Sequence, residues 1–481
     1  MRIICRFIVV SVWALFIIIT KSQAQCDDIS KIEKTFYVSS SIGNDKNDGL
    51  TKRSPKQHIS AIGQKENIHI LLKRGDVFFE QIQGYTNCII EDYGRGDKPV
   101  ICGFKVLINT MAWENVGKQL WKLDLSKTSN FDGNIEKTPN KSFNNIGFIY
   151  NFLNDKIYGC NVSEVDLLKN EMDFYTTSFY PDTDMKQHSF TSIVVKSSSH
   201  PAELGHLCFS VCKTGITEMT NCIIRRIAIS GFGKNGMSVL NNCIVDDCQI
   251  DLIGGSLLLT SNNWVRFGNG IELWYNDCNN IITNCLISRT YDCATTIQAN
   301  GKINSNPHNN HFKNNRIYKC RQAFEHFLNP SNAFKAEYED CDFSYNICYL
   351  MGDNEFNSPE ARDCNILSYE KENRAISIKN NIFFGANHIF GTGITDGMTR
   401  NLVYIYSGQY LYLNHKVLTK IDASTEDNVK IGMYREIVPD NSKIVVLKRN
   451  SLRAKRIDRR IRSKVGWKKV DLKLERIIQR Q

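Results

Sequence analysis

Hydrophobic residues recur along the middle of the chain in a short pattern that repeats six times. Each copy has an apolar residue, then Asn, Cys or Ile three positions later, then an apolar residue two positions after that. The copies begin 21 to 37 residues apart, and a short strand that recurs with variable excursions is typical of a solenoid. Each coil then contributes one such strand, and neighbouring coils stack these strands in parallel about 4.8 Å apart. The copies are Ile224-Ile227-Ile229, Val245-Cys248-Ile250, Ile282-Cys285-Ile287, Phe312-Asn315-Ile317, Phe343-Asn346-Cys348 and Ile378-Asn381-Phe383.

Apolar runs on both sides of the repeats predict further strands. Runs at 35–39, 68–72, 88–90 and 99–101 have the spacing of first coils, and runs at 402–406 and 444–447 suggest closing strands. Between about 110 and 215 the rhythm breaks, and the apolar runs there predict a small inserted β-subdomain. The pattern therefore predicts an all-β parallel solenoid over residues 25–448 that carries this insert.

The N-terminus has the features of a signal peptide. Arg2 and Arg6 flank the start of an apolar run at 7–19, which is short for a membrane span, and Ser22 and Ala24 form a small-x-small cleavage site. We expect residues 1–24 to be removed after Ala24. No later run is long and apolar enough to span a bilayer, so we expect a secreted, periplasmic or cell-surface protein.

The net charge of +10 is concentrated at one end of the chain. Residues 449–481 hold thirteen Lys or Arg and three Asp or Glu, so the rest of the chain is close to neutral. This basic C-terminal tail is suited to an anionic glycan, lipid headgroups or a protein partner. A solvated amphipathic helix around Leu472, Leu474, Ile477 and Ile478 is an equally good interpretation, and nucleic-acid binding has little support.

Cysteine usage and the acidic loop at 43–49 both favour structural roles. The chain has 17 cysteines, and Cys248, Cys285 and Cys348 occupy repeat positions where other copies have Ile or Asn, which predicts small core residues rather than a disulfide framework. There is no Cys-x-x-Cys pair that would indicate zinc. Asp45 and Asp48 raise the possibility of calcium as a cofactor, but their loop lacks the ligand spacing of an EF-hand, and turn formation is the better interpretation.

A second set of strands, beyond the repeat, predicts which distant residues become neighbours. The segments 270–274, 294–298 and 323–327 align with one another, with a weaker upstream copy at 236–240. Because strand side chains alternate between faces, Glu272, Thr296 and Glu325 are expected in one outward column, and Trp274, Gln298 and Phe327 in the next. His326 falls in the inward set, which indicates a core histidine.

This alignment also gathers charged and aromatic residues on one strip. Glu272 and Glu325 should lie about 9–10 Å apart across two coils, near the upper limit for the carboxylates of an inverting glycosidase. Asp292 and Arg321 occupy equivalent places in adjacent coils and are expected to pair. The same strip contains Arg266 and Tyr291, while Trp274 offers a flat surface for a sugar ring. Taken one at a time these residues read as structural, but together they indicate a functional cleft.

Three stretches resemble the secreted bacterial right-handed parallel β-helix proteins related to pectate lyases. The stretch from Tyr37-Val38-Ser39 to Pro55 looks like the entry strand and cap of that family, and Arg74-Gly75-Asp76 with Lys98-Pro99-Val100-Ile101 looks like its first coils. The most specific stretch combines Cys248-Gln249-Ile250, Ile253-Gly254-Gly255, Arg266-Phe267-Gly268-Asn269-Gly270-Ile271-Glu272, Tyr291-Asp292 and Gln298. The resemblance implies a right-handed helix and a role with polysaccharides, although fold does not determine function.

We therefore expect a polysaccharide-active protein, either a lyase or a glycoside hydrolase. In a lyase, Arg266 or Arg321 would neutralise a uronate, and Tyr291 or an arginine would move the proton. In a hydrolase, Glu325 and Glu272 would divide the acid and base roles. Asp292 completes the catalytic candidates, and Trp274, Gln298 and Asn269 are expected to contact the substrate. A non-catalytic glycan-binding scaffold and a sugar epimerase are the alternatives.

Overall fold

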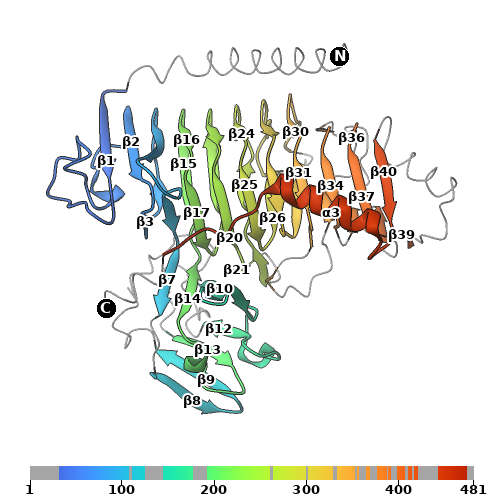
Figure 1. Ribbon diagram of the computed structural model, residues 1–481, viewed down its shortest axis with the longest axis horizontal. Coiled ribbons are helices and arrows are strands. Elements are labelled where there is room, and N and C mark those ends of the chain that lie inside the picture. Colours follow the sequence, from blue (N-terminus) through green and yellow to red (C-terminus); the bar gives the residue numbers. More distant parts are fainter. Residues whose placement is uncertain are drawn as a thin grey trace.

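The chain folds as a right-handed parallel β-helix. The computed structural model describes residues 32–107, 111–124, 145–176, 192–259, 264–299, 302–328, 333–352, 355–356, 364–368, 376–386, 388–391, 398–406, 410–413, 416–420 and 442–473. The expected signal peptide at 1–24 lies outside these residues. Strands stack side by side from β1 at one end to β40 at the other, and a smaller β-subdomain projects from the first half of the stack (Figure 1).

Three long sheets form the walls of the solenoid. Sheet A contains, in order, β1 (Lys34–Val38), β2 (Ile68–Lys73), β5 (Ile89–Tyr93), β16 (Ile223–Arg225), β19 (Ile244–Asp246), β24 (Ile281–Thr283), β27 (His311–Lys313), β30 (Asp342–Ser344), β33 (Ser377–Lys379) and β36 (Met398–Thr399). Sheet B contains β4 (Ile82–Gln83), β15 (Ile216–Thr220), β18 (Met237–Asn241), β23 (Ile271–Trp274), β26 (Cys293–Ala299), β29 (Gln322–Leu328), β32 (Cys364–Ser368), β35 (His388–Gly391), β38 (Tyr410–Leu413) and, antiparallel at its end, β39 (Lys416–Lys420).

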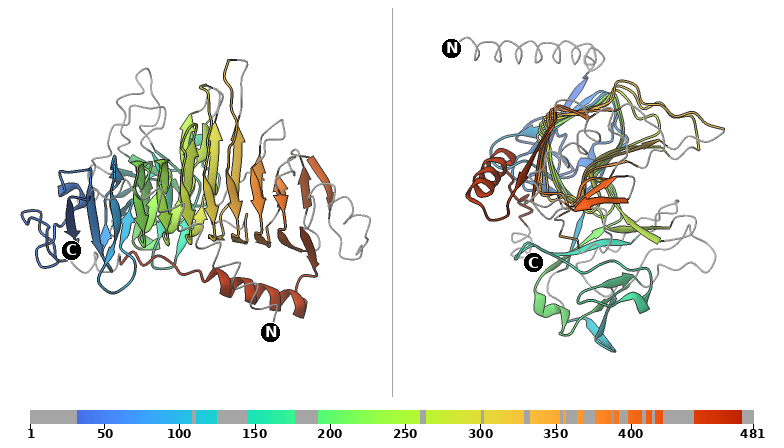
Figure 2. Two further views of the ribbon diagram at one scale, coloured as in Figure 1. Left: turned by 90° about the horizontal axis from the view of Figure 1, so that it is seen from above. Right: turned by 90° about the vertical axis from the view of Figure 1, so that its right-hand side faces the viewer.

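Sheet C forms the third wall and is continuous with part of the insert. Its parallel part contains β3 (Val77–Phe78), β6 (Val100–Cys102), β17 (Ala228–Phe232), β20 (Gln249–Ile253), β25 (Leu286–Thr290), β28 (Arg316–Tyr318), β31 (Ile347–Tyr349), β34 (Ile382–Phe384), β37 (Leu402–Tyr406) and β40 (Lys443–Leu447). The coils stack around a shared interior, as the view along the solenoid in Figure 2 shows. Buried apolar residues from all three sheets fill this interior as one core.

The repeated sequence motif spans a corner rather than a single strand. Its first residue lies in sheet A, where Ile224, Val245 and Ile282 stack, and its last residue lies in sheet C, where Ile229, Ile250 and Ile287 stack. The expectation of one strand per copy was wrong for this reason, although the stacking order that it predicted is found. In the seven coils from β16 to β37 the residue just before the corner adopts a left-handed conformation, which lets the chain turn sharply between the sheets. These residues are Arg226, Asp247, Asn284, Asn314, Tyr345, Asn380 and Arg400, with φ between 47° and 58°.

The middle position of the motif holds the corner together through buried hydrogen bonds. The Asn346 side chain accepts from the backbone N–H of Asn315 (2.8 Å) and donates to the carbonyl of Phe312 (3.0 Å). Asn381 repeats both bonds one coil further on, at 2.8 Å and 2.9 Å. In earlier coils Cys285 takes this place, and its thiol donates to the equivalent carbonyl of Val245. Cys248, Cys285 and Cys348 are at most 1% exposed and are free thiols, in keeping with the predicted core role.

The insert is a compact β-subdomain with its own core. A four-stranded sheet contains β8 (Trp113–Gly117), β9 (Leu120–Asp124), β12 (Phe174–Thr176) and β13 (Ser192–Lys196). Next to it, β7 (Phe104–Leu107), β10 (Ile146–Asn151), β11 (Lys156–Tyr158) and β14 (Leu207–Val211) extend sheet C by antiparallel pairing. The insert also contains two short 3-10 helices, η4 (Val165–Leu167) and η5 (Pro201–Leu204), and a third, η2 (Ile59–Ala61), lies between β1 and β2. The apolar runs predicted between 110 and 215 all lie in these strands.

The basic tail folds back along sheet C. Helix α3 (Leu452–Val465) crosses the outer face of this sheet roughly along the long axis of the solenoid (Figure 1). Residues 466–473, which we call the strap, continue in extended form towards the first coils, where the Lys473 ammonium donates to the carbonyl of Gly75 (2.8 Å). Leu472, where the sequence pattern predicts the start of a helix, lies in the non-helical strap and is 4% exposed, while Leu474, Ile477 and Ile478 lie outside the described residues.

Candidate active site

The predicted strip lies on the outer face of sheet B, across three consecutive strands. Register between β23, β26 and β29 pairs Glu272 with Thr296 and Thr296 with Glu325. In the neighbouring column, Trp274 pairs with Gln298 and Gln298 with Phe327. The intervening residues point inward, and His326 among them is 1% exposed. The spatial order of both columns is the one that the alternating sequence pattern predicts.

Glu325 is an acid held in a nearly closed environment. Glu325 is only 6% exposed. One of its carboxyl oxygens accepts hydrogen bonds from the Gln298 amide (2.6 Å) and from the Cys293 thiol (3.4 Å). Burial, together with the negative charge of Asp292, raises the pKa of Glu325 to about 8. Glu325 is therefore protonated at neutral pH, as a proton donor in catalysis must be.

Glu272 is held by two stacked asparagines. One oxygen accepts from the Asn235 amide (2.8 Å) and the other from the Asn269 amide (2.7 Å). Burial raises the pKa of Glu272 above its usual value, and the two amides and the Lys234 charge oppose that rise. Both oxygens thus have fixed directions, which suits a carboxylate that must orient a water molecule.

Asn269 links Glu272 to the neighbouring strands through hydrogen bonds inside the wall of the solenoid. Its backbone N–H donates to the Asn235 side chain (2.9 Å), and its own side-chain oxygen accepts from the N–H of Cys293 (3.0 Å). Since Asn269 is also 4% exposed, both ends of its amide are engaged with protein groups. The expectation that it touches substrate is not supported by this position, and Asn269 instead orients Glu272.

A further acid, Asp277, is buried just beyond the end of β23. It accepts from the backbone N–H of Trp274 (2.9 Å) and from the Asn241 amide (3.4 Å), and it is 7% exposed. Burial raises its pKa to about 7, with a further contribution from the charge of Glu272. Three carboxyl groups with raised pKa values in one region are typical of a functional site.

Asp292 and Arg321 form the ion pair that their equivalent places in adjacent coils predict. Arg321 Nη1 lies 3.7 Å from Asp292 Oδ1, with the arginine side chain 5% exposed and the aspartate side chain 23% exposed. The Arg321 guanidinium also lies 5.8 Å from the centre of the Tyr291 ring. Arg321 is thus inside the wall, and its charge lowers the pKa of Glu325 against the larger effect of burial.

Tyr291 lies below the surface, and the partly exposed Arg266 is held against it. Tyr291 is completely buried, and the Arg266 guanidinium stacks over its ring at 4.3 Å. Arg266 donates to the carbonyls of Gly255 (3.1 Å) and Phe356 (3.2 Å). Neither side chain is placed to meet a substrate at the outer face, so the direct catalytic roles expected for them have no support in this geometry.

Close glycine packing beside Tyr291 explains how this buried arrangement forms. The hairpin of β21 (Ser256–Leu259) and β22 (Trp264–Phe267), which carries Arg266, leaves the solenoid between Gly254 and Gly268. Gly254 has φ 101° and Gly268 has φ 133°, and a Cβ on Gly268 would lie 2.2 Å from the Cα of Gly254. Only glycine fits both positions.

Aromatic rings border the carboxyl groups. The partly exposed Trp274 contacts Phe327 edge-to-face at 6.3 Å between ring centres, and the ring of Tyr275 lies 5.3 Å from it. Gln298 lies between Trp274 and Phe327 in register and is 6% exposed, with its amide directed to Glu325. Partly exposed rings beside acids are suited to stacking on a sugar.

Asp277, Asn235 and Cys293 were missed by the sequence reasoning. Asn235-Gly236 and Asn269-Gly270 precede equivalent strands of sheet B, so their alignment contained a signal for the stacked asparagines. Asp277 carries no such signal, because it follows its strand in a turn without a counterpart in the aligned segments. The burial of Cys293 under Glu325 depends on side-chain packing that register alone does not define.

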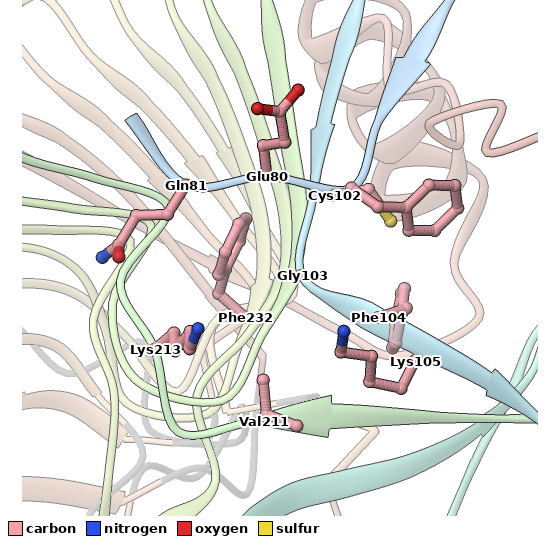
Figure 3. A pocket seen from close by; sticks show the side chains of 10 residues that line it. Glu80, Gln81, Cys102, Gly103, Phe104, Lys105, Val211, Lys213 and Phe232 are labelled. Carbon is pink, nitrogen blue, oxygen red and sulfur yellow. The ribbon is translucent and has the colours of Figure 1, made fainter. Parts of the chain in front are cut away.

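Other features of the molecule do not contribute to this strip. A small pocket where the first coils meet the insert is shown in Figure 3, and it is lined by Phe79, Glu80, Gln81, Cys102, Gly103, Phe104, Lys105, Val211, Lys213 and Phe232. Asp45 accepts hydrogen bonds from the backbone N–H groups of Gln57 and His58, both at 2.9 Å, so its carboxylate stabilises the loop at 43–49. Over the residues that the structure covers, no three His, Cys, Asp or Glu side chains are grouped to hold a metal ion.

Comparisons with known proteins give distant likenesses. No protein-family model and no curated protein matches the chain. The solved structure of XylC in complex with xylose aligns over 80% of this chain and 70% of that chain, with 11% identity and a TM-score of 0.43. The GH136 lacto-N-biosidase from Eubacterium ramulus, as native protein and as selenomethionine derivative, aligns over 86% of this chain and 68% of that chain, with 12% identity and a TM-score of 0.33. Likenesses this distant carry no argument about activity.

No membrane span is found among the elements that the structure describes, because α3 is too short and too polar to cross a bilayer.

Proposed function

We propose that this chain is a glycoside hydrolase that cleaves a polysaccharide or an oligosaccharide derived from one, with inversion at the anomeric carbon. The observation that carries the proposal is the buried Glu325 carboxyl, with a pKa of about 8, two strands away from the amide-held Glu272. Two strand spacings of about 4.8 Å separate their Cα atoms by roughly 9.6 Å. Inverting enzymes hold their two carboxyl groups about 6.5–9.5 Å apart, with a water molecule between them and the sugar, and this Cα spacing is near the upper end of that range.

The chemistry divides between the two acids. Glu325 gives its proton to the glycosidic oxygen as the bond from that oxygen to the anomeric carbon breaks. Glu272 takes a proton from a water molecule, whose oxygen forms the new bond to the anomeric carbon from the opposite side. After this step the proton of Glu325 is on the hydroxyl of the leaving sugar and Glu272 holds the proton taken from the water molecule. Exchange with solvent then reprotonates Glu325 and deprotonates Glu272. Trp274 and Phe327 would hold the sugar ring beside the acids, and Gln298 and Asn269 would act as positioning residues.

A lyase is less well supported by the geometry. Elimination needs a cation against the uronate carboxyl and a base at the carbon next to it. Arg266 donates to the carbonyl of Phe356, Arg321 pairs with Asp292, and Tyr291 is completely buried. An epimerase would need the same exposed proton-transfer groups. A non-catalytic glycan-binding protein is the second candidate, since Glu325 and Gln298 are each only 6% exposed while Trp274 is more accessible.

The test is a panel of neutral and acidic polysaccharides and their oligosaccharides, with products identified by mass spectrometry. We expect hydrolysis products whose first-formed anomer, read by proton NMR, is inverted. Replacing the acid in Glu325→Gln or the base in Glu272→Gln should lower kcat by at least about 100-fold, since general acid–base groups contribute this much or more. The matched control is Glu218→Gln, an exposed glutamate of the same sheet in strand β15.

Three outcomes would contradict the proposal. Binding of a glycan without any product would favour the scaffold. Products with an unsaturated uronate and its ultraviolet absorbance would favour the lyase. Retention of the anomeric configuration would mean that Glu272 and Glu325 do not hold the assigned roles.

A further inference from the structure

Helix α3 is fixed to the solenoid by one apolar side. Ala454, Ile461 and Val465 are each at most 3% exposed and pack against the outer face of sheet C. The Ser451 hydroxyl accepts from the N–H of Ala454 (3.1 Å) at the start of the helix, and Gly466 ends it in a left-handed conformation with φ 58°. The orientation of the helix is therefore set, and its opposite side faces solvent.

That opposite side is almost entirely cationic. Its exposed cations are Arg453, Lys455, Arg456, Arg459, Arg460 and Lys464, and among the described residues none of them has a carboxylate within ion-pairing distance. Arg462 is different, because it pairs with Asp458 (3.3 Å) and donates to the Tyr349 hydroxyl (3.1 Å). Exposed cations continue past both ends of the helix at Lys448, Arg449 and Lys468.

This arrangement is unfavourable for the helix itself. Arg453, Arg456, Arg460 and Lys464 follow one another at spacings of three or four residues, so like charges repel along one edge. Arg453 and Lys455 also lie in the first turn, where the helix dipole disfavours cations. The packing on sheet C holds the helix in place despite these costs, and an anionic partner would remove them.

We propose that the exposed face of α3, defined by its six unpaired cations, is a binding site for a linear anionic glycan, that is, one carrying uronate or sulfate groups. The helix is about 21 Å long and lies along the solenoid axis, so its cations form a straight row that a rod-like polyanion can follow. This surface lies on sheet C, apart from the candidate active site on sheet B, and the proposal does not depend on the hydrolase activity.

A membrane surface is a poorer fit to the same charges. Helices that lie in a membrane interface insert an apolar face into the lipid. The apolar face of α3 is already packed against sheet C, and the ring of Trp467 contacts Tyr318 at 5.1 Å between ring centres. Leu452, at the first position of the helix, is the one large apolar side chain of α3 that is exposed, at 84%. A single leucine is a small anchor beside six cations, which favours a hydrophilic polyanion.

The experiment compares binding of the full chain to polygalacturonate, dextran sulfate and uncharged dextran. The helix variant is R453Q/R456Q/R460Q/K464Q. The control variant K46Q/K52Q/R53Q/R95Q removes the same four charges from exposed positions in the first coils. We expect salt-dependent binding of at least one polyanion by the wild type, no binding of dextran, and affinity lowered by about tenfold or more in the helix variant. The control variant should stay within about twofold of wild type.

Folding of the variants is checked by melting temperature, which we expect to be unchanged or slightly raised in the helix variant because repulsion is removed. The smaller variant R456Q/R460Q should lose about half of the change in log affinity, which separates a binding effect from misfolding. Equal losses in the helix and control variants would overturn the proposal in favour of a general charge effect. Binding to vesicles of phosphatidylglycerol and phosphatidylcholine, with none to either polyanion, would overturn it in favour of a lipid surface.

Discussion

The outer faces of sheets B and C are both covered, yet they bury opposite kinds of side chain. On sheet C, the outward column of Tyr318, Tyr349, Phe384 and Tyr404 runs across four coils, with successive ring centres 5.4–5.8 Å apart. Helix α3 packs over this column. On sheet B, the outward column of Glu272, Thr296 and Glu325 is polar, although Thr296 is fully buried and Glu325 nearly so.

The difference separates stability from function. Burying an aromatic or aliphatic side chain contributes about 1.5–3 kcal/mol, so the covered face of sheet C stabilises the solenoid. Burying an acid costs free energy unless it is neutralised or fully hydrogen-bonded, so the same coverage on sheet B is unfavourable for folding. A scaffold that uses apolar columns elsewhere has no structural need for this cost, which is why we assign the function to sheet B.

The largest effect should come from placing a charge in the apolar face of sheet C. Ile461→Asp puts a carboxylate where the side chain is 3% exposed against sheet C. We expect the free energy of unfolding to fall by about 4 kcal/mol, because a buried unpaired charge and lost packing add together. Denaturant unfolding measures the change. Arg460→Asp, at the adjacent exposed position, is the control and should change stability by less than about 0.5 kcal/mol. Similar losses in both variants would mean that α3 does not seal this face.

On sheet B, replacing the buried Glu325 carboxyl by an amide should raise the free energy of unfolding, which is the opposite of the effect of Ile461→Asp on sheet C. Burial raises the pKa of Glu325 from 4.5 to about 8, so between these values the folded protein holds a proton that the unfolded chain has released. Wild-type stability from this group is therefore full at low pH and is lost as the pH rises towards about 8. Glu325→Gln cannot lose a proton, so relative to wild type it should gain a few kcal/mol in stability as the pH rises from 5 to 9.

Melting curves of wild type and Glu325→Gln across this pH range measure the gain. Glu218→Gln, at an exposed position of the same sheet, should run parallel to wild type at every pH. A constant difference between wild type and Glu325→Gln would show that the carboxyl is ionised throughout, and the contrast between the two faces would fail on the side of sheet B.

Much of this contrast is present in the sequence as register. Alternation within the aligned segments is enough to place Glu272, Thr296 and Glu325 in one column. Because the strands stack in parallel without insertions, every second residue points to the same face in each coil. Asp292 and Arg321 follow from the same alignment. These neighbours depend only on positions within the aligned segments, so a single sequence is enough to predict them.

The residues that pack over the outer face of a sheet cannot be predicted by aligning the repeat segments. Phe356 reaches Arg266 and Tyr291 from a different coil, and no periodicity links those positions. The sequence pattern drew attention to 472–478 and not to α3, because the apolar spacing at 454–465 is no more helical than that at 472–478, and the packing of α3 on sheet C is not visible in the sequence. The burial of Glu325 and the raised pKa of Asp277 are likewise consequences of three-dimensional coverage.

The smallest effect should come from the corner that supports both faces. Asn346→Ala removes the acceptor for the N–H of Asn315 and the donor for the carbonyl of Phe312, both buried, so we expect a loss of about 2 kcal/mol in denaturant unfolding. Asn346→Cys is the matched variant, because a thiol at the equivalent Cys285 still donates to its carbonyl, and it should lose about half as much. Since Asn346 touches neither outer face, the pH dependence of stability should stay as in wild type. A changed pH dependence in Asn346→Ala would mean that the corner and the acids of sheet B are coupled, and the two faces could not be treated as independent.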